Sequence, residues 1–568
     1  MKARPVEFAA PVGAVIAVEV LVLVAALALA PADVSWYPLI AVALVAVLLL
    51  FLRVHRRTPL GWLAAVWRWR RRRGRLPVTV AAALDIPHGS ALCGVRTVDG
   101  EAITMIAVAG QPYAATALTG SANALTTNLL PMDVLADSLD QPGGVRLAGI
   151  DVVSSGVRVR RGTGYPPLYS TLLADRPAAG QRTTRLIVRL DTSESLGGLV
   201  YRTSVGATAA AATERIVNAL LQRGVRARPL TAKELDTALT ELGAGMVAVA
   251  AAGTGDGGEA AAGDEIGQAG WVGMRPPPPP PPRERWHTIA AHPGYLTTYW
   301  FSPEDITTTA LNQLWALRSD EVVVTVAMRK DRSPVDDRVK VAALVRLNDP
   351  QPPSNPPNLY LNTLPGDQQP AAVRCLPAER SYTRLPERPL DDVGLDIPVG
   401  PSGVMVGTTA TGDLLLLPLT DPEQATRIHL RTGTAYTRQL LIRAAAVGER
   451  IAVYTDNPRQ WAGLAQPLIA IVDRHHPPEF VPTILVSDRR GGPPPAGLAS
   501  TVITLGEADR MSAPDIAFVQ TSPSTVRITT AAFTTDVNIA TFKAEQPFLG
   551  EIEPPRSPRY APARGALR

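Results

Sequence analysis

Two long apolar runs open the chain. Residues 11–30 are apolar except for Glu19, and residues 39–52 are apolar throughout. About 20 apolar residues suffice to cross the hydrocarbon core of a membrane. Trp36 and Tyr37 stand just before the second run, where interfacial aromatic residues are typical. The pattern therefore predicts a hairpin of two transmembrane helices.

Basic residues on both sides of this hairpin predict its orientation. Residues 1–75 carry 11 Lys and Arg against three acids, and the connection between the two apolar runs carries only Asp33. Basic flanks stay on the cytoplasmic side, so we expect a protein of the inner (plasma) membrane with both termini in the cytoplasm. A cleaved signal peptide is the alternative, but a second apolar run follows at once and no cleavage site fits.

A segment rich in Trp and Arg follows the second apolar run. Thr58-Pro59 is typical of a helix start, and residues 61–75 then alternate tryptophans with arginines. This composition predicts a helix on the anionic inner leaflet, whereas an RNA-binding arm is the rival interpretation. The side chains expected to contact lipid are Arg68, Arg70, Arg71, Arg72 and Arg73.

The rest of the chain alternates short strand-like and helix-like patterns, which predicts α/β cytoplasmic domains after the two transmembrane helices. A Gly/Ala-rich stretch followed by seven consecutive prolines, residues 276–282, interrupts the pattern and predicts a linker inserted into the first domain. The expected boundaries are 1–75 for the hairpin and basic helix, 76–243 for the core domain, 244–285 for the linker, 286–380 for the completion of the core domain, 381–550 for a C-terminal domain and 551–568 for a disordered tail.

Charge and cysteine content narrow the range of functions. The hairpin and basic helix have a net charge of +8, which leaves 45 basic against 48 acidic residues in the rest of the chain. The body therefore has no basic surface of the kind that binds nucleic acid, and we expect no nucleic-acid partner. Cys93 and Cys375 lie far apart without metal-ligand spacing, which favours a reduced compartment and no metal.

Two segments resemble phosphate-binding loops but lack the residues that such loops need. Gly407 to Gly412 has the glycine spacing, but Asp413 stands where lysine should follow. A better-placed candidate begins at Arg431, between a predicted strand and a predicted helix. Only Gly433 of its glycines remains, with Thr437 in the lysine slot and Arg438 in the magnesium slot. We therefore predict a C-terminal α/β unit with a degenerate P-loop-like fold, no cofactor and no catalytic residue.

Several stretches of the first 350 residues form a recognisable set: the hairpin with its arginine run, His88 to Arg96, Met132 to Val153, Arg185 to Asp191 and Ala211 to Leu242. Together these stretches resemble EccE, a membrane component of the type VII (ESX) secretion system. The segment from Leu395 to Asp456 is similar to the entry of an FtsK/EccC-type ATPase domain, without the lysine. No catalytic motif is carried by these stretches, so the resemblance assigns no active-site residue.

The resemblance implies a non-catalytic subunit of a membrane complex that exports substrates of the WXG100 and PE/PPE kinds. Its expected partners are subunits of the EccB, EccC and EccD types together with anionic inner-leaflet lipids. Two alternatives from other classes stay open at this point. One is a membrane-anchored enzyme of glycosyltransferase type, which Asp-rich motifs would favour, but Asp336-Asp337 and Asp391-Asp392 lie in loop-like, proline-flanked sequence. The other is a nucleotide-sensing protein.

Overall fold

The computed structural model describes most of the body of the chain. The described residues are 6–8, 12–29, 37–54, 57–72, 76–89, 91–200, 202, 204–250, 280–292, 294–332, 336–378, 385–472, 478–488, 501–506 and 513–549. Most of the expected linker, the expected tail and Arg73 lie outside these ranges.

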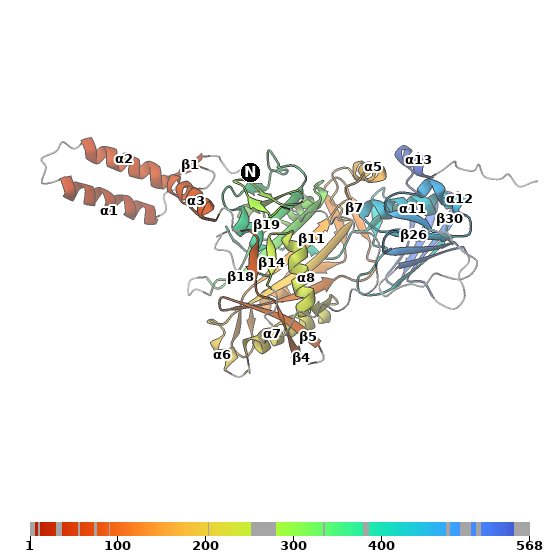
Figure 1. Ribbon diagram of the computed structural model, residues 1–568, viewed down its shortest axis with the longest axis horizontal. Helices are drawn as coiled ribbons and strands as arrows, with labels where there is room; N and C mark the ends of the chain where they lie inside the picture. The colour runs from red at the N-terminus through yellow and green to blue at the C-terminus, as the bar shows by residue number, and fades with distance from the viewer. Residues whose placement is uncertain are drawn as a thin grey trace, which may run out of the picture.

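Two apolar helices, α1 (Val12–Leu29) and α2 (Tyr37–Phe51), lie side by side and project from the body, and α3 (Pro59–Arg72) lies between them and the body (Figure 1). Two short strands, β1 (Val6–Phe8) and β2 (Leu52–Val54), pair beside them.

The prediction of two transmembrane helices is wrong for the described residues. None of their helices combines the length and the apolar character that crossing a membrane requires. At 1.5 Å per residue, the 18 residues of α1 span about 27 Å and the 15 residues of α2 about 22 Å. Both are shorter than the hydrocarbon core of about 30 Å. The first apolar run has 20 residues and α1 has 18, while the second run is itself short, so the expected two-span topology is not supported.

A 14-stranded sheet forms the centre of the body. Its main path runs β15-β16-β17-β19-β18-β11-β12-β6-β5-β4, and every pairing within it is antiparallel. The strands on this path are β15 (Arg283–Glu284), β16 (Ile289–Ala290), β17 (Tyr295–Phe301), β19 (Val339–Asp349), β18 (Glu321–Lys330), β11 (Val145–Val157), β12 (Gln181–Asp191), β6 (Glu101–Ala109), β5 (Ala91–Val98) and β4 (Leu84–His88). Shorter strands at its margins are β10 (Asp140–Gln141), β13 (Arg226–Pro229), β20 (Leu361–Thr363) and β21 (Arg388–Pro389).

Helices cover both faces of this sheet. Side chains alternate between the two faces along each strand, and apolar side chains on both faces are buried under these helices. On β6, Ile106 faces the apolar core that α7 (Val205–Gln222) covers, whereas Ile103 and Met105 face the core that α8 (Ala232–Gly243) covers. Thr231 caps α8 in a capping box with Glu234. The remaining elements on the two faces are α4 (Met132–Asp137), α6 (Leu196–Leu199), η2 (Pro303–Asp305), α9 (Thr308–Gln313), η3 (Leu314–Ala316), α10 (Gln368–Arg374), β3 (Val78–Val80), β14 (Val247–Val249), β9 (Leu129–Leu130) and β22 (Ile397–Pro398).

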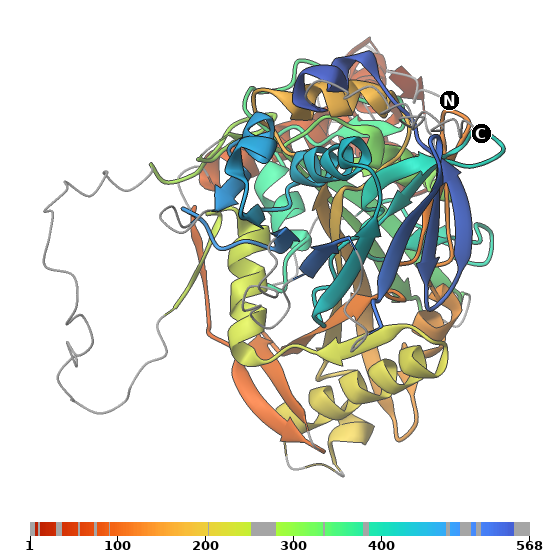
Figure 2. The same cartoon turned by 90° about the vertical axis from the view of Figure 1, so that its right-hand side faces the viewer.

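A second sheet of 12 strands builds the other end of the body, which faces the viewer in Figure 2. Its order is β27-β26-β28-β29-β25-β30-β31-β32-β23-β24-β7-β8, parallel from β27 to β30 and antiparallel beyond. The parallel strands are β27 (Ile469–Val472), β26 (Ile451–Thr455), β28 (Ile484–Asp488), β29 (Thr501–Leu505), β25 (Thr426–Arg431) and β30 (Ile516–Ser522). The antiparallel strands are β31 (Thr525–Thr530), β32 (Thr534–Asn538), β23 (Val404–Thr408), β24 (Leu414–Leu417), β7 (Thr116–Thr119) and β8 (Asn123–Thr126).

The predicted fold class also needs correction in its balance, because the described part of the protein is an α/β structure that is mostly β. The second sheet takes its last two strands, β7 and β8, from far upstream in the chain. Strands that far apart in sequence give no local pattern that reveals their pairing. The helices around this sheet are α5 (Tyr165–Leu172), α11 (Thr434–Val447), α12 (Pro458–Trp461), η4 (Ala462–Leu464), η5 (Lys543–Glu545) and α13 (Gln546–Leu549).

Candidate functional site

The helix α3 carries most of the arginines that the sequence assigned to lipid contact. It begins at Pro59, and the Thr58 hydroxyl caps it by accepting a hydrogen bond from the Gly61 N–H at 3.1 Å. The helix has two different faces. One packs on the body and the other is exposed, so its basic residues divide into two groups.

The inner group, together with Arg57 just before the helix, converges on one carboxylate of the body, Asp367, at the start of α10. The Arg57 Nη2 and Arg72 Nη2 atoms lie 2.7 Å and 2.9 Å from the Asp367 carboxylate oxygens. Arg57 and Arg72 also donate to the carbonyl oxygens of Pro365 and Gly366, each at 2.8 Å. Arg68 Nη2 lies farther away, at 3.8 Å from Asp367. We call Arg57, Arg72 and Asp367 the arginine clamp.

An aromatic contact accompanies the clamp. The rings of Trp69 and Trp62 lie on Trp286 of the body, with centroid distances of 5.4 Å and 6.2 Å. Gly366 is fixed beside Trp286: its φ is +74°, and a Cβ there would lie 2.5 Å from the indole ring. Only glycine suits this backbone and this close approach, so the loop before Asp367 is shaped to fit under α3.

Burial controls the electrostatics around the clamp. Burial lowers the pKa of the Arg57 guanidinium, and the Asp367 carboxylate opposes this change. Glu284 lies beneath the same loop, where burial raises the pKa of its carboxyl group. Its Oε1 accepts a hydrogen bond from the Gln369 N–H at 3.0 Å. Asp367 is the carboxylate that pairs with the arginines, and its side chain is only 10% exposed.

The outer face of α3 points away from the body. Leu60, Leu63 and Trp67 are 46%, 66% and 55% exposed at helical spacing. Arg70 and Arg71 are exposed on this side, and the Arg71 guanidinium lies 3.8 Å from the centre of the Trp67 ring. Of the five arginines predicted to contact lipid, Arg70 and Arg71 are therefore free to face a surface, Arg68 and Arg72 reach toward Asp367, and Arg73 lies outside the described residues.

The second predicted site is the turn between β25 and α11. The Gly433 N–H, at the start of the helix, donates to Oε1 of Gln520 at 2.7 Å. Thr437 is buried, and its hydroxyl lies 2.9 Å from that of Thr432. A side-chain amide thus occupies the helix N-terminus, where a phosphate would sit in a nucleotide-binding loop.

Arg438, in the predicted magnesium slot, points toward the end of the chain instead. It donates to the carbonyl oxygens of Leu549 and Gln460, and burial lowers the pKa of its guanidinium. These contacts tie α11 to α12 and α13. The degenerate character of this turn nevertheless stays a prediction, because it concerns ligand binding.

Sequence reasoning did not identify Asp367 or Trp286, because both lie about 200 to 300 residues from α3. The only local signal was the Pro365-Gly366 turn before an isolated acid. Among the described residues, no group of three His, Cys, Asp or Glu side chains is placed to hold a metal ion. His475 and His476 lie outside those residues.

Comparisons with known proteins agree on one family. A family model described as "Putative type VII ESX secretion system translocon, EccE" matches residues 178–301. The ESX-2 secretion system protein EccE2 of Mycobacterium tuberculosis is 29% identical over 418 residues, which cover 73% of this chain and 71% of that protein. Both comparisons therefore indicate an EccE protein.

Other members of the EccE family match at lower identity. The ESX-5 protein EccE5 of Mycobacterium marinum is 28% identical over 56% of this chain and 73% of its own length. The ESX-1 protein EccE1 of Mycobacterium tuberculosis is 24% identical over 74% of this chain and 77% of its own length. The protein is thus a component of a type VII (ESX) secretion system, as the resemblance in its sequence indicated.

Proposed function

We propose that this EccE-family protein is a non-catalytic subunit that stabilises the ESX membrane complex from the cytoplasmic side. In this role it lies beside EccB-, EccC- and EccD-type subunits during export of WXG100 and PE/PPE-type substrates. The observation that carries the proposal is the two-faced helix α3. Its inner face is fixed to the body by the arginine clamp, and its outer face is exposed and both apolar and basic.

The outer face has the composition of a helix that lies in a membrane interface. Leu60, Leu63 and Trp67 would enter the headgroup region, while Arg70 and Arg71 would meet anionic lipids. Each arginine near an anionic surface contributes about 1 kcal/mol. Two of them therefore supply about 2 kcal/mol in addition to the apolar contact.

Contacts on the inner face of α3 fix the orientation of the body relative to the membrane. A domain on a flexible tether would sample many orientations, whereas a helix held at Asp367 and Trp286 fixes one orientation. Neighbouring subunits would then meet the same surface of the body in each copy. We therefore assign the clamp a positioning role within the complex.

Membrane contact of α3 can be measured with a nitroxide label at residue 63 of the full chain. Both native cysteines are buried, so Leu63→Cys provides a selective labelling position. In nanodiscs with anionic lipid, the label should become accessible to oxygen and protected from a polar relaxation agent. Val481→Cys, at a residue 74% exposed on the body, is the matched control and should remain in an aqueous environment. Equal polar accessibility at both positions would contradict lipid contact.

Three variants separate the structural role from a catalytic one. Asp367→Asn should reduce co-purification of the other membrane subunits and export of a WXG100 substrate, because α3 is no longer held. Arg70→Gln with Arg71→Gln should weaken membrane contact and leave the clamp intact.

The purified protein should neither hydrolyse nor tightly bind ATP, and Thr437→Ala should leave export unchanged. ATP hydrolysis that disappears in Thr437→Ala would refute the non-catalytic assignment.

A further inference from the structure

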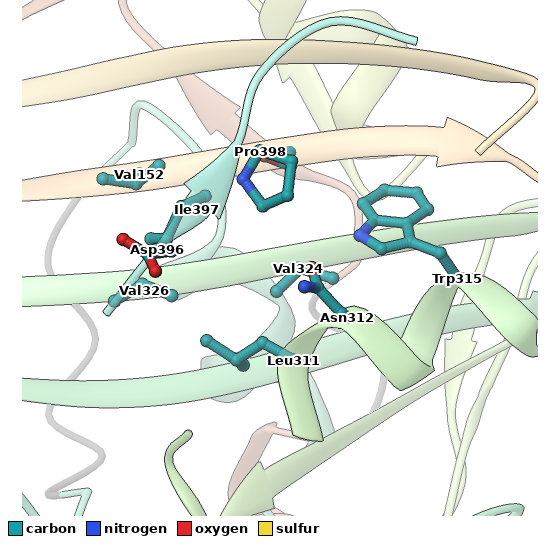
Figure 3. A pocket seen from close by; sticks show the side chains of 10 residues that line it. Val152, Leu311, Asn312, Trp315, Val324, Val326, Asp396, Ile397 and Pro398 are labelled. Atoms are coloured by element: carbon teal, nitrogen blue, oxygen red, sulfur yellow. The ribbon is translucent and has the colours of Figure 1, made fainter. Parts of the chain in front are cut away.

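A buried guanidinium without hydrogen-bond partners lies on the large sheet. The side chain of Arg346 on β19 is 0% exposed, and within the described residues none of its three nitrogen atoms makes a hydrogen bond. The carboxylate of Glu321 approaches its Nη2 atom only to 3.7 Å. Arg346 does not line the space beside Val152, Leu311 and Pro398, which has room for about one water molecule (Figure 3). A charge enclosed in this way destabilises the structure that covers it.

Residues 364–378, which include α10, cover this guanidinium, and we call them the strap. Thr298 lies opposite Arg346 on β17. The Gln368 side chain of the strap accepts from the Thr298 N–H at 2.8 Å and donates to the Thr298 carbonyl oxygen at 3.2 Å. Leu344 lies two residues from Arg346 and shares its face of the sheet. The strap residues that pack in one cluster with Leu344 are Leu364, Ala371 and Cys375.

Arginines hold both ends of the strap, but they belong to different parts of the protein. At its start, Asp367 pairs with the clamp arginines, Arg57 and Arg72. At its end, Arg189 of β12 donates to the first and last carbonyl oxygens of residues 376–378 at 2.9 Å and 2.8 Å, and Arg96 of β5 donates to the middle one at 2.6 Å. The end of the strap is therefore fixed to the sheet, whereas its start is fixed to α3 and the residue before it.

The apolar part of the strap is small. Three of its residues are proline and three are alanine, and Ala371, Ala372 and Ala378 are among its buried side chains. Burial of a single methyl group contributes little compared with burial of a leucine or phenylalanine side chain. Closure of the strap therefore depends strongly on its polar contacts, and those at its start are lost if α3 leaves the body.

We propose that docking of α3 keeps the strap closed over Arg346. When α3 leaves the body, Asp367 loses its arginine partners, the start of the strap lifts, and water reaches the Arg346 guanidinium. The unpartnered charge favours this open state, and the clamp opposes it. Docking of a surface helix thus controls whether a cationic part of the sheet, between β17 and β19, is accessible. The proposal uses the clamp but not the assigned place in a membrane complex.

Cysteine alkylation of the full chain in detergent measures opening of the strap. Cys375 lies in the strap and Cys93 lies on β5, and both are buried. Burial raises the pKa of the Cys375 thiol, and the Arg346 charge opposes this change. Burial also raises the pKa of Cys93, to about 11. Neither thiol reacts readily while it is covered, so N-ethylmaleimide labelling followed by mass spectrometry reports two opening rates from one sample.

The decisive variant changes only residues outside the strap. Arg57→Gln with Arg72→Gln should accelerate alkylation of Cys375 at least about tenfold and leave Cys93 at the wild-type rate. The matched control is Arg70→Gln with Arg71→Gln on the exposed face of the same helix, which should leave both rates unchanged. An unchanged rate at Cys375 in the first variant would overturn the proposal. Equal acceleration at both cysteines would overturn it as well, because the whole fold and not the strap would then be opening.

Arg346→Met tests the charge beneath the strap. Amide hydrogen exchange is the measurement here, because the Arg346 charge also affects the Cys375 thiol. Loss of an unpartnered buried charge should slow exchange in residues 371–376 at least about threefold. Lys340→Met on the same strand removes a charge that is paired with Asp331 and Asp336, and it should leave this exchange unchanged. Faster exchange in a folded Arg346→Met protein would overturn the proposal.

The two experiments are independent of each other and of membrane contact. The α3 variants leave the core unchanged, so their result stands even if Arg346→Met fails to fold. No lipid or partner subunit enters either measurement, so failure of the strap proposal and failure of the proposed role in the membrane complex are distinguishable.

Discussion

Two arginine–carboxylate clusters in this protein differ in burial and in what they hold together. In the arginine clamp, Arg57 and Arg72 are 22% and 23% exposed and converge on Asp367, while backbone carbonyl oxygens accept further bonds from both. In the second cluster, Arg443 of α11 and Glu545 of η5 are 1% and 0% exposed. The first joins a surface helix to the body, and the second lies inside the core.

The buried cluster has a single acceptor that serves several donors. Glu545 accepts from Arg443 Nε and Nη2 at 2.8 Å and 3.0 Å, from Gln439 at 2.5 Å, and from the Tyr165 hydroxyl. It thereby joins α5, α11 and η5. Removing one partner of a buried pair leaves an uncompensated charge, whereas a partly exposed arginine can turn to water. The comparison therefore predicts different costs for similar substitutions.

The largest effect is expected for Glu545→Ala. This change leaves the Arg443 guanidinium buried without its carboxylate, and we expect a loss of about 3–5 kcal/mol of unfolding free energy. Unfolding of the C-terminal region in denaturant, followed by the fluorescence of buried Trp461, measures it. The exposed neighbour provides the control, because Lys543→Ala should cost little. Similar midpoints for the two variants would show that the buried pair is not the stabilising element.

A smaller and local effect is expected for Asp367→Asn. The variant loses the charge that Arg57 and Arg72 share, which should weaken docking of α3 by about 1–3 kcal/mol. Amide hydrogen exchange in residues 59–72 should accelerate, while exchange in β11 and β12 should stay as in the wild type. The control is Asp391→Asn at an exposed residue. Unchanged exchange in α3 would mean that the aromatic contact with Trp286 alone holds the helix.

A third carboxylate sharpens the comparison, because Glu449 is buried with hydroxyl partners instead of a bound arginine. Its oxygens accept from Thr420 at 3.0 Å and from Thr483 at 2.5 Å, and burial raises the pKa of its carboxyl group. The stability that a protonated Glu449 contributes is complete below the ordinary pKa of 4.5 and is lost as the pH rises through the raised value.

The prediction for Glu449→Gln is therefore a flatter pH dependence. As the pH rises from the ordinary pKa of 4.5 through the raised value, the wild type should lose more of its melting temperature than the variant does. The exposed Glu479 supplies the control, since Glu479→Gln should leave the slope unchanged. An equally steep loss in Glu449→Gln would assign the pH dependence to another group.

The smallest effect on folding is expected on the outer face of α3. Arg70→Gln with Arg71→Gln removes two exposed charges that the body does not use, so the free energy of unfolding should change by about 0.5 kcal/mol or less. Thermal melting in detergent measures this change. The double substitution Arg57→Gln with Arg72→Gln is the matched comparison. If both pairs destabilise equally, the division of α3 into two faces is wrong.

Much of the local structure followed from the sequence. The sequence has Ile/Val-rich runs at residues 103–108, 149–153 and 184–190, typical of strands, and they lie within β6, β11 and β12. Its apolar stripe at 213–223, typical of a helix, overlaps the second half of α7, which ends at Gln222. The basic segment forms a helix that begins after Thr58, as its capping residues predict. The prediction of two membrane spans was wrong, because α1 has 18 residues where its apolar run has 20, and α2 has only 15.

The sequence by itself determined the elements whose pattern is local and the resemblance to EccE proteins. It also determined which residues of α3 are basic, but not which of them are available. Only the tertiary structure decided that Arg57 and Arg72 are held by Asp367, and that β7 and β8 complete a sheet formed mainly by residues nearly 300 positions later. The physical reason is that an ion pair or a strand pairing between distant segments depends on how both are packed, and neither segment alone records its partner.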